Sequence, residues 1–277
     1  MDSIRLACVR YLNTAPLIHG LDRLQGLTLL PCAPADISGM VFRSEAELGL
    51  ASIVDALRAP AETVLFPVGM IGCDGATLTV RVFSRVPLAN VRVLAADRES
   101  HTSVVLARLI MKRSLGVSVD VTDYREGDPW PEAVLLIGDK VIINHPPESL
   151  YPHQLDLGLA WKELTGLPFV YAMWMARAAA ADDPRVVLAA RLLDRQRRHN
   201  AGRMEWLVRT YAPKAGWPLE TARRYLCDLL RYEVTQGAMD AVRVFGEMAR
   251  AEGLLPAGGM PRVATISAAT SAPPAAR

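Results

Sequence analysis

Apolar positions in the first part of the chain form short runs separated by segments with a helical pattern. The predicted strands here are 4–9, 27–32 and 63–71, with another after "AELGLAS", and the predicted helices are 16–24 and 37–42. Pro67 lies inside the 63–71 run, which indicates a strand that is bent or at a sheet edge. This first unit therefore alternates strands and helices.

A second unit of the same kind begins near Val91. A strand at 91–97 is followed by "ESHTS", which opens a helix that runs to Leu115 and stops at Gly116. Further apolar strands are predicted at 133–139 and 169–176. From Pro184 to about Arg250 the pattern predicts three helices, and the Ala-, Pro-, Gly- and Ser-rich segment after that predicts a disordered tail.

Two units of alternating strands and helices predict an α/β protein with mostly parallel sheets and two lobes. The strands at 77–84 and 169–176 fall at the unit boundaries, so we expect them to cross between the lobes. The expected organisation is a first part of lobe 1 at 1–84, lobe 2 at 85–172, a mainly helical return to lobe 1 at 173–255, and a disordered tail at 256–277.

Composition excludes several classes of protein. The 277 residues contain 31 basic and 29 acidic side chains, and the resulting net charge of +2 argues against nucleic-acid binding. No run approaches the ~20 apolar residues of a membrane span, and the N-terminus lacks the pattern of a secretory signal. The four cysteines form no CxxC pair, so we expect a reducing, cytoplasmic setting.

Polar side chains follow three of the predicted strands. They are Asn13 and Thr14 in "YLNTAPL", the "SHTS" stretch 100–103, and the Gly138–Asp139 pair. Helix capping or turn formation accounts for each of them singly. Because ligands of α/β proteins bind beyond the carboxyl ends of strands, and helix N-termini attract anions, the three together predict a cleft for a small acid.

Two other kinds of site find little support in the sequence. Cys73 lies between glycines in "IGCDGATLT", but no histidine is near it in sequence, and a buried structural cysteine is the more common case. The five histidines show no metal-ligand spacing, so no metal site is expected.

Several segments together resemble the chorismate dehydratase family of the futalosine route to menaquinone. They are "YLNTAPL", "GCDGATLTVRVFSRVPL", "SHTS", "LLIGD" and "DLGLAWKELTGLPFVYAMWMAR", in that order over roughly residues 4–250. The resemblance implies the two-lobed type II fold of periplasmic binding proteins, with two crossover strands and a helical C-terminal part, in a cytoplasmic enzyme.

The resemblance also implies a reaction and a site. The reaction is loss of water from chorismate to give 3-[(1-carboxyvinyl)oxy]benzoate by a carbon–oxygen lyase, without cofactor, metal, membrane or nucleic acid. The implied catalytic residues are Asn13 and Thr79. The implied substrate-binding residues are Tyr11, Thr14, Ser100, His101, Thr102, Ser103, Gly138 and Asp139.

The sequence departs from the family pattern at three places. Thr79 stands where the family usually has Ser, His101 where Arg is common, and Ala51–Ser52 where Val-Pro is usual. None of the matched positions except His101 offers an obvious base, so we expect the substrate's own enolpyruvyl carboxylate to take the proton from C3.

Two alternatives to a dehydratase follow from the same fold. One is a non-catalytic protein that senses or binds a small carboxylate. The other is the effector-binding lobe pair of a transcription regulator, for which residues 1–90 leave no room for a helix-turn-helix. Turnover of chorismate distinguishes the dehydratase from both.

Overall fold

The computed structural model describes residues 3–97 and 99–266. The strands are β1 Ile4–Cys8, β2 Leu27–Pro31, β3 Leu48–Ser52, β4 Thr63–Cys73, β5 Val80–Ser84, β6 Val93–Asp97, β7 Asp120–Tyr124, β8 Ala133–Ile137, β9 His153–Asp156, β10 Phe169–Arg177, β11 Leu230–Arg231 and β12 Arg262–Val263. The α-helices are α1 Ala15–Ile18, α2 Ile37–Phe42, α3 Ile53–Arg58, α4 His101–Leu115, α5 Lys140–Ile143, α6 Leu157–Thr165, α7 Pro184–Ala201, α8 Met204–Tyr211, α9 Leu219–Arg223 and α10 Gln236–Ala251.

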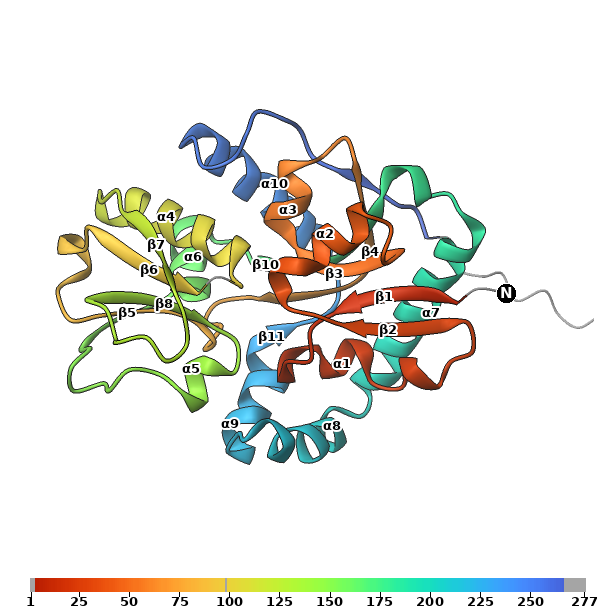
Figure 1. Ribbon diagram of the computed structural model, residues 1–277, viewed down its shortest axis with the longest axis horizontal. Coiled ribbons are helices and arrows are strands. Elements are labelled where there is room, and N and C mark those ends of the chain that lie inside the picture. The colour runs from red at the N-terminus through yellow and green to blue at the C-terminus, as the bar shows by residue number, and fades with distance from the viewer. Residues whose placement is uncertain (1–2, 98, 267–277) are drawn as a thin grey trace, which may run out of the picture.

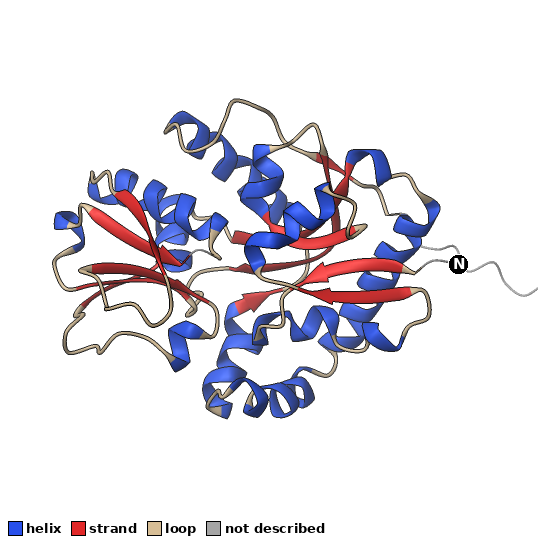
Figure 2. Cartoon of the chain, viewed as in Figure 1, coloured by secondary structure: helices blue, strands red, loops and turns tan. Residues whose placement is uncertain are grey.

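The strands form two separate sheets, one in each lobe (Figure 1). The larger sheet has the order β11-β4-β10-β3-β1-β2, with β12 paired to β4, and the smaller has the order β7-β6-β8-β5-β9. Helices cover both sheets, as Figure 2 shows, and the C-terminal helices return to the larger lobe. The predicted two-lobed α/β architecture is confirmed.

The sheets are mixed, whereas the sequence pattern predicted mostly parallel sheets. β1 is parallel to β2 and β3, but β10 is antiparallel to β3 and β4. In the smaller sheet β5 is antiparallel to both of its neighbours. Apart from the two-residue β11, which is antiparallel to β4, the antiparallel pairs each contain a strand next to a crossing. A chain that crosses between lobes enters a sheet without the usual strand-helix-strand connection.

The bend predicted from Pro67 is present, but β4 is not an edge strand. β10 pairs Met173 with Met70 and the next residue, Trp174, with Phe66. Residues 67–69 of β4 therefore bulge out of the ladder, which is where a residue without a backbone N–H is tolerated.

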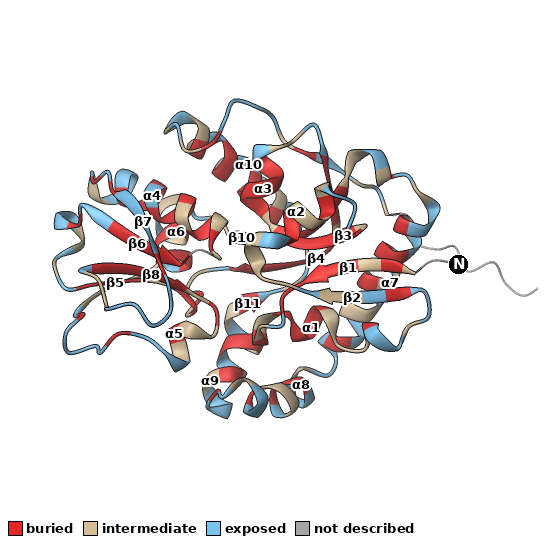
Figure 3. Ribbon diagram, in the orientation of Figure 1, coloured by how far each residue is buried: buried red, intermediate tan, exposed pale blue. Residues whose placement is uncertain are grey.

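The apolar core is continuous from one lobe to the other. α4 of the smaller lobe packs against α3 and α10 of the larger one. The largest fully buried side chains include Trp174 and Phe66 in the larger sheet and Trp161 on α6. Figure 3 shows these inner faces buried, with exposed residues on the outer helix faces and loops. The lobes thus meet through packed side chains around the cavity described below.

Sheet membership bears on where the lobes divide. β5 belongs wholly to the smaller sheet and β10 wholly to the larger one. These memberships favour a chain that crosses between the lobes at 74–79 and 157–168. The boundaries predicted from the sequence were at 84/85 and 172/173. The lobe boundaries themselves remain a prediction.

Part of the segment expected to be a disordered tail has a defined place. β12 pairs in parallel with β4, and the Ala264 backbone N–H donates to the carbonyl of Leu65 at 2.8 Å. The composition did not indicate this strand, because pairing with an existing sheet orders a segment that could not form a core alone. The rest of the predicted tail, 267–277, lies outside the described residues.

The helix predicted at 16–24 is shorter than expected. α1 ends at Ile18, and Gly20 adopts φ +83°, which turns the chain before a short 3-10 segment at 21–23. Within the described part of the chain, no helix is long and apolar enough to cross a membrane.

Candidate functional site

A cavity lies between the two sheets and opens to solvent. The lining comes from the turn after β1, the end of β3, the crossing before β5, the start of α4, the end of β8, and β10. Its polar residues are Tyr11, Asn13, Ser52, Thr77, Thr79, Glu99, Ser100, His101, Thr102, Ser103, Tyr171 and Tyr225.

Eight of the ten predicted site residues line this cavity, among them both predicted catalytic ones. They are Tyr11, Asn13, Thr79, Ser100, His101, Thr102, Ser103 and Gly138. Three polar strand ends that are far apart in the sequence thus meet in one place. Substrate contact by these residues remains a prediction.

Thr14 and Asp139 are the two predicted site residues outside the lining. The Thr14 hydroxyl is fully buried and donates to the carbonyl of Val9 at 3.0 Å or to that of Tyr11 at 2.8 Å. Asp139 accepts from the backbone N–H of Leu12 at 3.4 Å and from Trp217 Nε1 at 3.1 Å, so it ties the lobes together. Burial raises the pKa of Asp139. The geometry gives no support to substrate contacts by either residue.

The end of the cavity formed by the turn after β1 brings three polar side chains together. The Oδ1 atom of Asn13 is buried and has no partner among the described residues. The Oγ1 atom of Thr79 lies 2.6 Å from the hydroxyl of Tyr225, and both side chains are buried. Burial raises the pKa of Tyr225, and its contacts with Thr79 and Asn13 oppose that shift. We call these three residues the Asn13 end.

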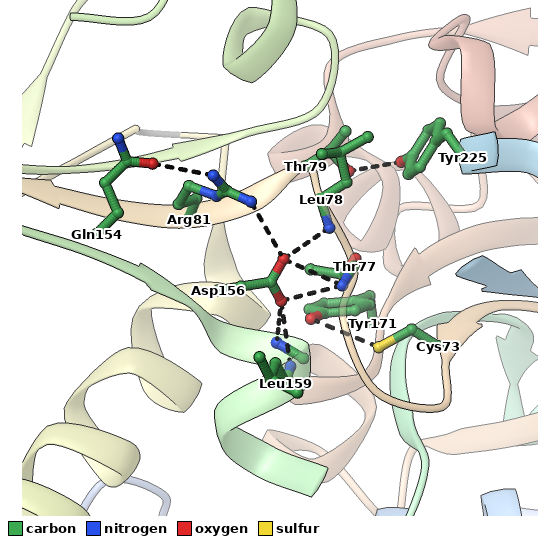
Figure 4. Close-up of polar contacts among 11 residues, drawn as sticks. Cys73, Thr77, Leu78, Thr79, Arg81, Gln154, Asp156, Leu159, Tyr171 and Tyr225 are labelled. Carbon is green, nitrogen blue, oxygen red and sulfur yellow. Dashed lines mark hydrogen bonds and ion pairs between the residues drawn. The ribbon is translucent and has the colours of Figure 1, made fainter. Parts of the chain in front are cut away.

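Asp156 holds the crossing that carries Thr79 (Figure 4). Its carboxylate accepts from the backbone N–H of Thr77 at 3.0 Å and of Leu78 at 2.8 Å, while also capping α6. Leu78 has φ +68°, a conformation that costs a non-glycine residue free energy. The carboxylate thus stabilises a strained backbone directly before Thr79, which fixes the direction of the Thr79 side chain.

The opposite end of the cavity is built around the first turn of α4. Thr102 Oγ1 lies 2.7 Å from Ser52 Oγ and donates to the carbonyl of Tyr171 at 3.0 Å. It also lies 3.4 Å from the backbone N–H of Val54 in the first turn of α3. The hydroxyl of Ser100 is buried without a partner in the described chain. We call this region, with its neighbours His101 and Ser103, the α4 end.

Charged groups of the lining are already engaged. The Nδ1 atom of His101 lies 2.9 Å from Asp55 Oδ1, which joins the two lobes. Glu99 accepts from the hydroxyl of Tyr11, also across the lobes, and lies 3.2 Å from Lys140 Nζ. Burial first, and Glu99 second, raise the pKa of Tyr11. Among the lining residues that the structure describes, a ligand acid would therefore meet hydroxyl and amide groups rather than a free cation.

The alternatives of a cysteine nucleophile or a metal site find no support. Cys73 is fully buried, burial raises the pKa of its thiol to about 12, and its Sγ lies 4.0 Å from the hydroxyl of Tyr171. A protonated buried thiol is a poor nucleophile. Among the residues that the structure describes, no group of three His, Cys, Asp or Glu side chains is arranged to hold a metal ion.

Sequence reasoning missed Tyr225, Asp156 and the pairing of Ser52. Tyr225 lies on a π-helical turn, Arg224–Leu229, and is 146 positions from Thr79, so no local pattern points to it. Asp156 had a usable signal, because an Asp between a strand and a helix is a typical N-cap. Its hydrogen bonds to the backbone of Thr77 and Leu78, 79 and 78 positions away, left no signal in the local sequence.

Comparison with known proteins shows to which family and fold the chain belongs. A chorismate dehydratase of Thermus thermophilus is 29% identical, covering 87% of this chain and 93% of its own length. A protein of Archaeoglobus fulgidus (TM-score 0.67, 17% identity, 91% of this chain and 98% of the other) shares the fold. So does the alkanesulfonate-binding protein of Xanthomonas axonopodis (TM-score 0.65, 12% identity, 93% and 95%). A family profile described as menaquinone biosynthesis matches residues 4–251. The predicted periplasmic-binding-protein-like fold is thereby confirmed, and the chain belongs to the menaquinone biosynthesis family.

Proposed function

We propose that this protein is a chorismate dehydratase, a carbon–oxygen lyase that converts chorismate to 3-[(1-carboxyvinyl)oxy]benzoate and water. The observation that carries the proposal is the unpartnered, buried Oδ1 of Asn13 beside the Thr79–Tyr225 hydroxyl pair in the cavity between the lobes. The family and the name of the Thermus relative support the same reaction. The cytoplasmic setting expected from the sequence stays part of the proposal.

The α4 end is suited to a carboxylate. The first backbone N–H groups of a helix have no partner within the helix, and its dipole favours negative charge there. α4 is 15 residues long, and the unpartnered hydroxyl of Ser100 precedes its first turn. Hydrogen bonds to a charged group contribute ~1.5–3 kcal/mol each, so a few of them at this end can hold a substrate carboxylate.

The Asn13 end is suited to the elimination. An amide and two hydroxyl groups there can orient the C4 hydroxyl and the enolpyruvyl group of chorismate. In our proposal the enolpyruvyl carboxylate takes the C3 proton, the C4–O bond breaks with its electron pair on the oxygen, which leaves as water once protonated, and the ring becomes aromatic. The Oδ1 atom of Asn13 accepts a hydrogen bond from the C4 hydroxyl and so orients it, and the Thr79 hydroxyl donates a hydrogen bond that stabilises the departing oxygen.

The Asp55–His101 pair is the other group that could accept the C3 proton. Its geometry, a carboxylate bonded to Nδ1 of a histidine that lines the cavity, is the arrangement that orients a general base. We assign the pair to substrate binding and to the contact between the lobes. It belongs to the α4 end, where the ring carboxylate of the substrate would lie, and the enolpyruvyl group would lie at the Asn13 end.

Incubation of the purified protein with chorismate tests the proposal. We expect chorismate to disappear and a product lighter by one water to form, as followed by liquid chromatography with mass detection. The Asn13→Ala protein serves as the matched control, since it should bind chorismate but turn it over far more slowly. Unchanged chorismate at high protein concentration, together with calorimetric binding of chorismate, would contradict the enzyme and favour a carboxylate-binding protein.

A further inference from the structure

Tyr225 is a buried phenol to which the mechanism above assigns no proton transfer. It is 1% exposed, and its ring stacks on Trp217 with centroids 5.0 Å apart and planes at 18°. Trp217 in turn donates to Asp139 of the smaller lobe. These contacts fix the ring, so its hydroxyl has a defined position at the cavity wall. π-helical turns such as the one that carries it are frequent at functional sites.

We propose that Tyr225 supplies the proton that converts the departing C4 hydroxyl into water, through the hydroxyl of Thr79. The inference rests on the proposed dehydration and adds a catalytic role that the sequence did not indicate. Its basis is geometric: the two oxygens are 2.6 Å apart, and both side chains line the cavity. Thr79 touches the leaving group, and Tyr225 is the next group in the chain of hydrogen bonds.

The protons and electrons of the step balance. The C4–O bond breaks with its electron pair on oxygen, Thr79 gives its hydroxyl proton to that oxygen, and Tyr225 gives its own proton to Thr79. The enolpyruvyl carboxylate holds the proton from C3. After release, the product acid loses that proton to solvent and the tyrosinate gains one, so the net change is loss of one water.

Among the residues that the structure describes, the other groups of the lining that could donate a proton are occupied or lie elsewhere. Glu99 accepts from Tyr11 and pairs with Lys140, and His101 is held by Asp55. The hydroxyl of Tyr171 lies against Cys73, where Figure 4 also shows it apart from the Thr79–Tyr225 pair.

Burial is compatible with this role. It raises the pKa of Tyr225, so the phenol stays protonated at neutral pH and is ready to donate. Hydroxide is a far stronger base than tyrosinate, which makes the transfer favourable once the C4–O bond breaks. A general acid of this kind typically contributes 10²–10⁴-fold to a rate.

The test compares Tyr225→Phe with Tyr232→Phe. Tyr232 is a matched control, because its hydroxyl is also buried but has no partner in the described chain. We expect Tyr225→Phe to lower kcat for chorismate about 10²-fold while KM and the calorimetric Kd of the product change less than about threefold. Tyr232→Phe should retain wild-type kcat.

A double-mutant cycle separates the relay from a structural tie. If both hydroxyl groups act in one relay, Thr79→Ala/Tyr225→Phe should be hardly slower than either single variant. Should Tyr225→Phe fail to fold, 3-fluorotyrosine at position 225 keeps the shape and should still change kcat, because it alters the acidity of the phenol.

Two results overturn the inference while leaving the dehydratase in place: wild-type kcat in Tyr225→Phe, or a loss confined to KM or melting temperature. Wild-type protein that does not turn over chorismate removes the proposed function, and the inference with it. That outcome is seen before any variant is measured.

Discussion

The two ends of the cavity use hydroxyl groups in different ways. At the α4 end, Thr102 reaches across the lobes and is satisfied by Ser52, by the Tyr171 carbonyl and by the N-terminus of α3. The Ser100 hydroxyl beside it has no partner in the described chain and is free for a ligand carboxylate. At the Asn13 end, Thr79 has a single hydroxyl partner and the Asn13 oxygen has none in the described chain. A buried polar group without a partner costs ~1–3 kcal/mol, so it indicates a place where a ligand completes the bonding.

Backbone geometry strengthens this contrast. The α4 end stands on a regular helix of 15 residues, whereas Thr79 follows a strained Leu78 that the Asp156 carboxylate holds in place. Strain that the surroundings maintain is typical of positions that act on a substrate. The comparison thus assigns carboxylate binding and lobe closure to the α4 end and the elimination to the Asn13 end.

The largest expected effect comes from Asn13→Ala. The Asn13 side chain makes no capping hydrogen bond in the structure, so a residue that only turned the chain would leave both the stability and the rate nearly unchanged when replaced. Because we assign its oxygen to orienting the C4 hydroxyl, we expect kcat to fall ~10²-fold or more with the fold retained. Steady-state kinetics and thermal unfolding measure the two quantities. Near-wild-type kcat would remove the distinction between the two ends.

A smaller effect, on KM rather than on kcat, is expected from Ser100→Ala. Loss of one hydrogen bond to a substrate carboxylate should raise KM ~10-fold and leave kcat within about threefold. Thr102→Val is the matched control, because that hydroxyl is already satisfied by the protein and its loss should appear mainly as ~1–3 kcal/mol lower unfolding free energy. A fall in kcat for Ser100→Ala with unchanged KM would contradict the assignment.

The smallest effect is expected from Thr79→Ser. The serine keeps the hydroxyl that bonds Tyr225 and loses only a methyl group, so kcat should stay within about threefold of wild type or rise as crowding is relieved. Thr79→Ala should instead resemble Asn13→Ala. Equal loss in both Thr79 variants would show that the methyl contact, and not the hydroxyl, matters at this position.

The sequence predicted much of the local structure. The helix that opens at "SHTS" runs as α4 to Leu115, and Gly116 ends it with φ +68°, as expected. The apolar runs at 133–139 and 169–176 became β8 and β10. These elements were readable because continuous burial and a glycine stop leave a local pattern.

Other elements left no such pattern. β7 is mostly exposed and polar, and β9 is half-buried, so neither shows an apolar run or a strict alternation. β11 and β12 are two residues long and exist because an existing strand, β4, offers them hydrogen bonds.

By itself the sequence determined the order of the elements and the strand ends at which polar side chains appear, because these depend on neighbours within a few residues. Only the tertiary structure decided that Tyr225 meets Thr79 and that Asp156 holds the crossing before it. Those contacts join positions 146 and 78 apart, and they exist because the C-terminal helices return to the larger lobe and the crossings bring both lobes to one cavity. Packing between distant segments sets such distances, and no local pattern records it.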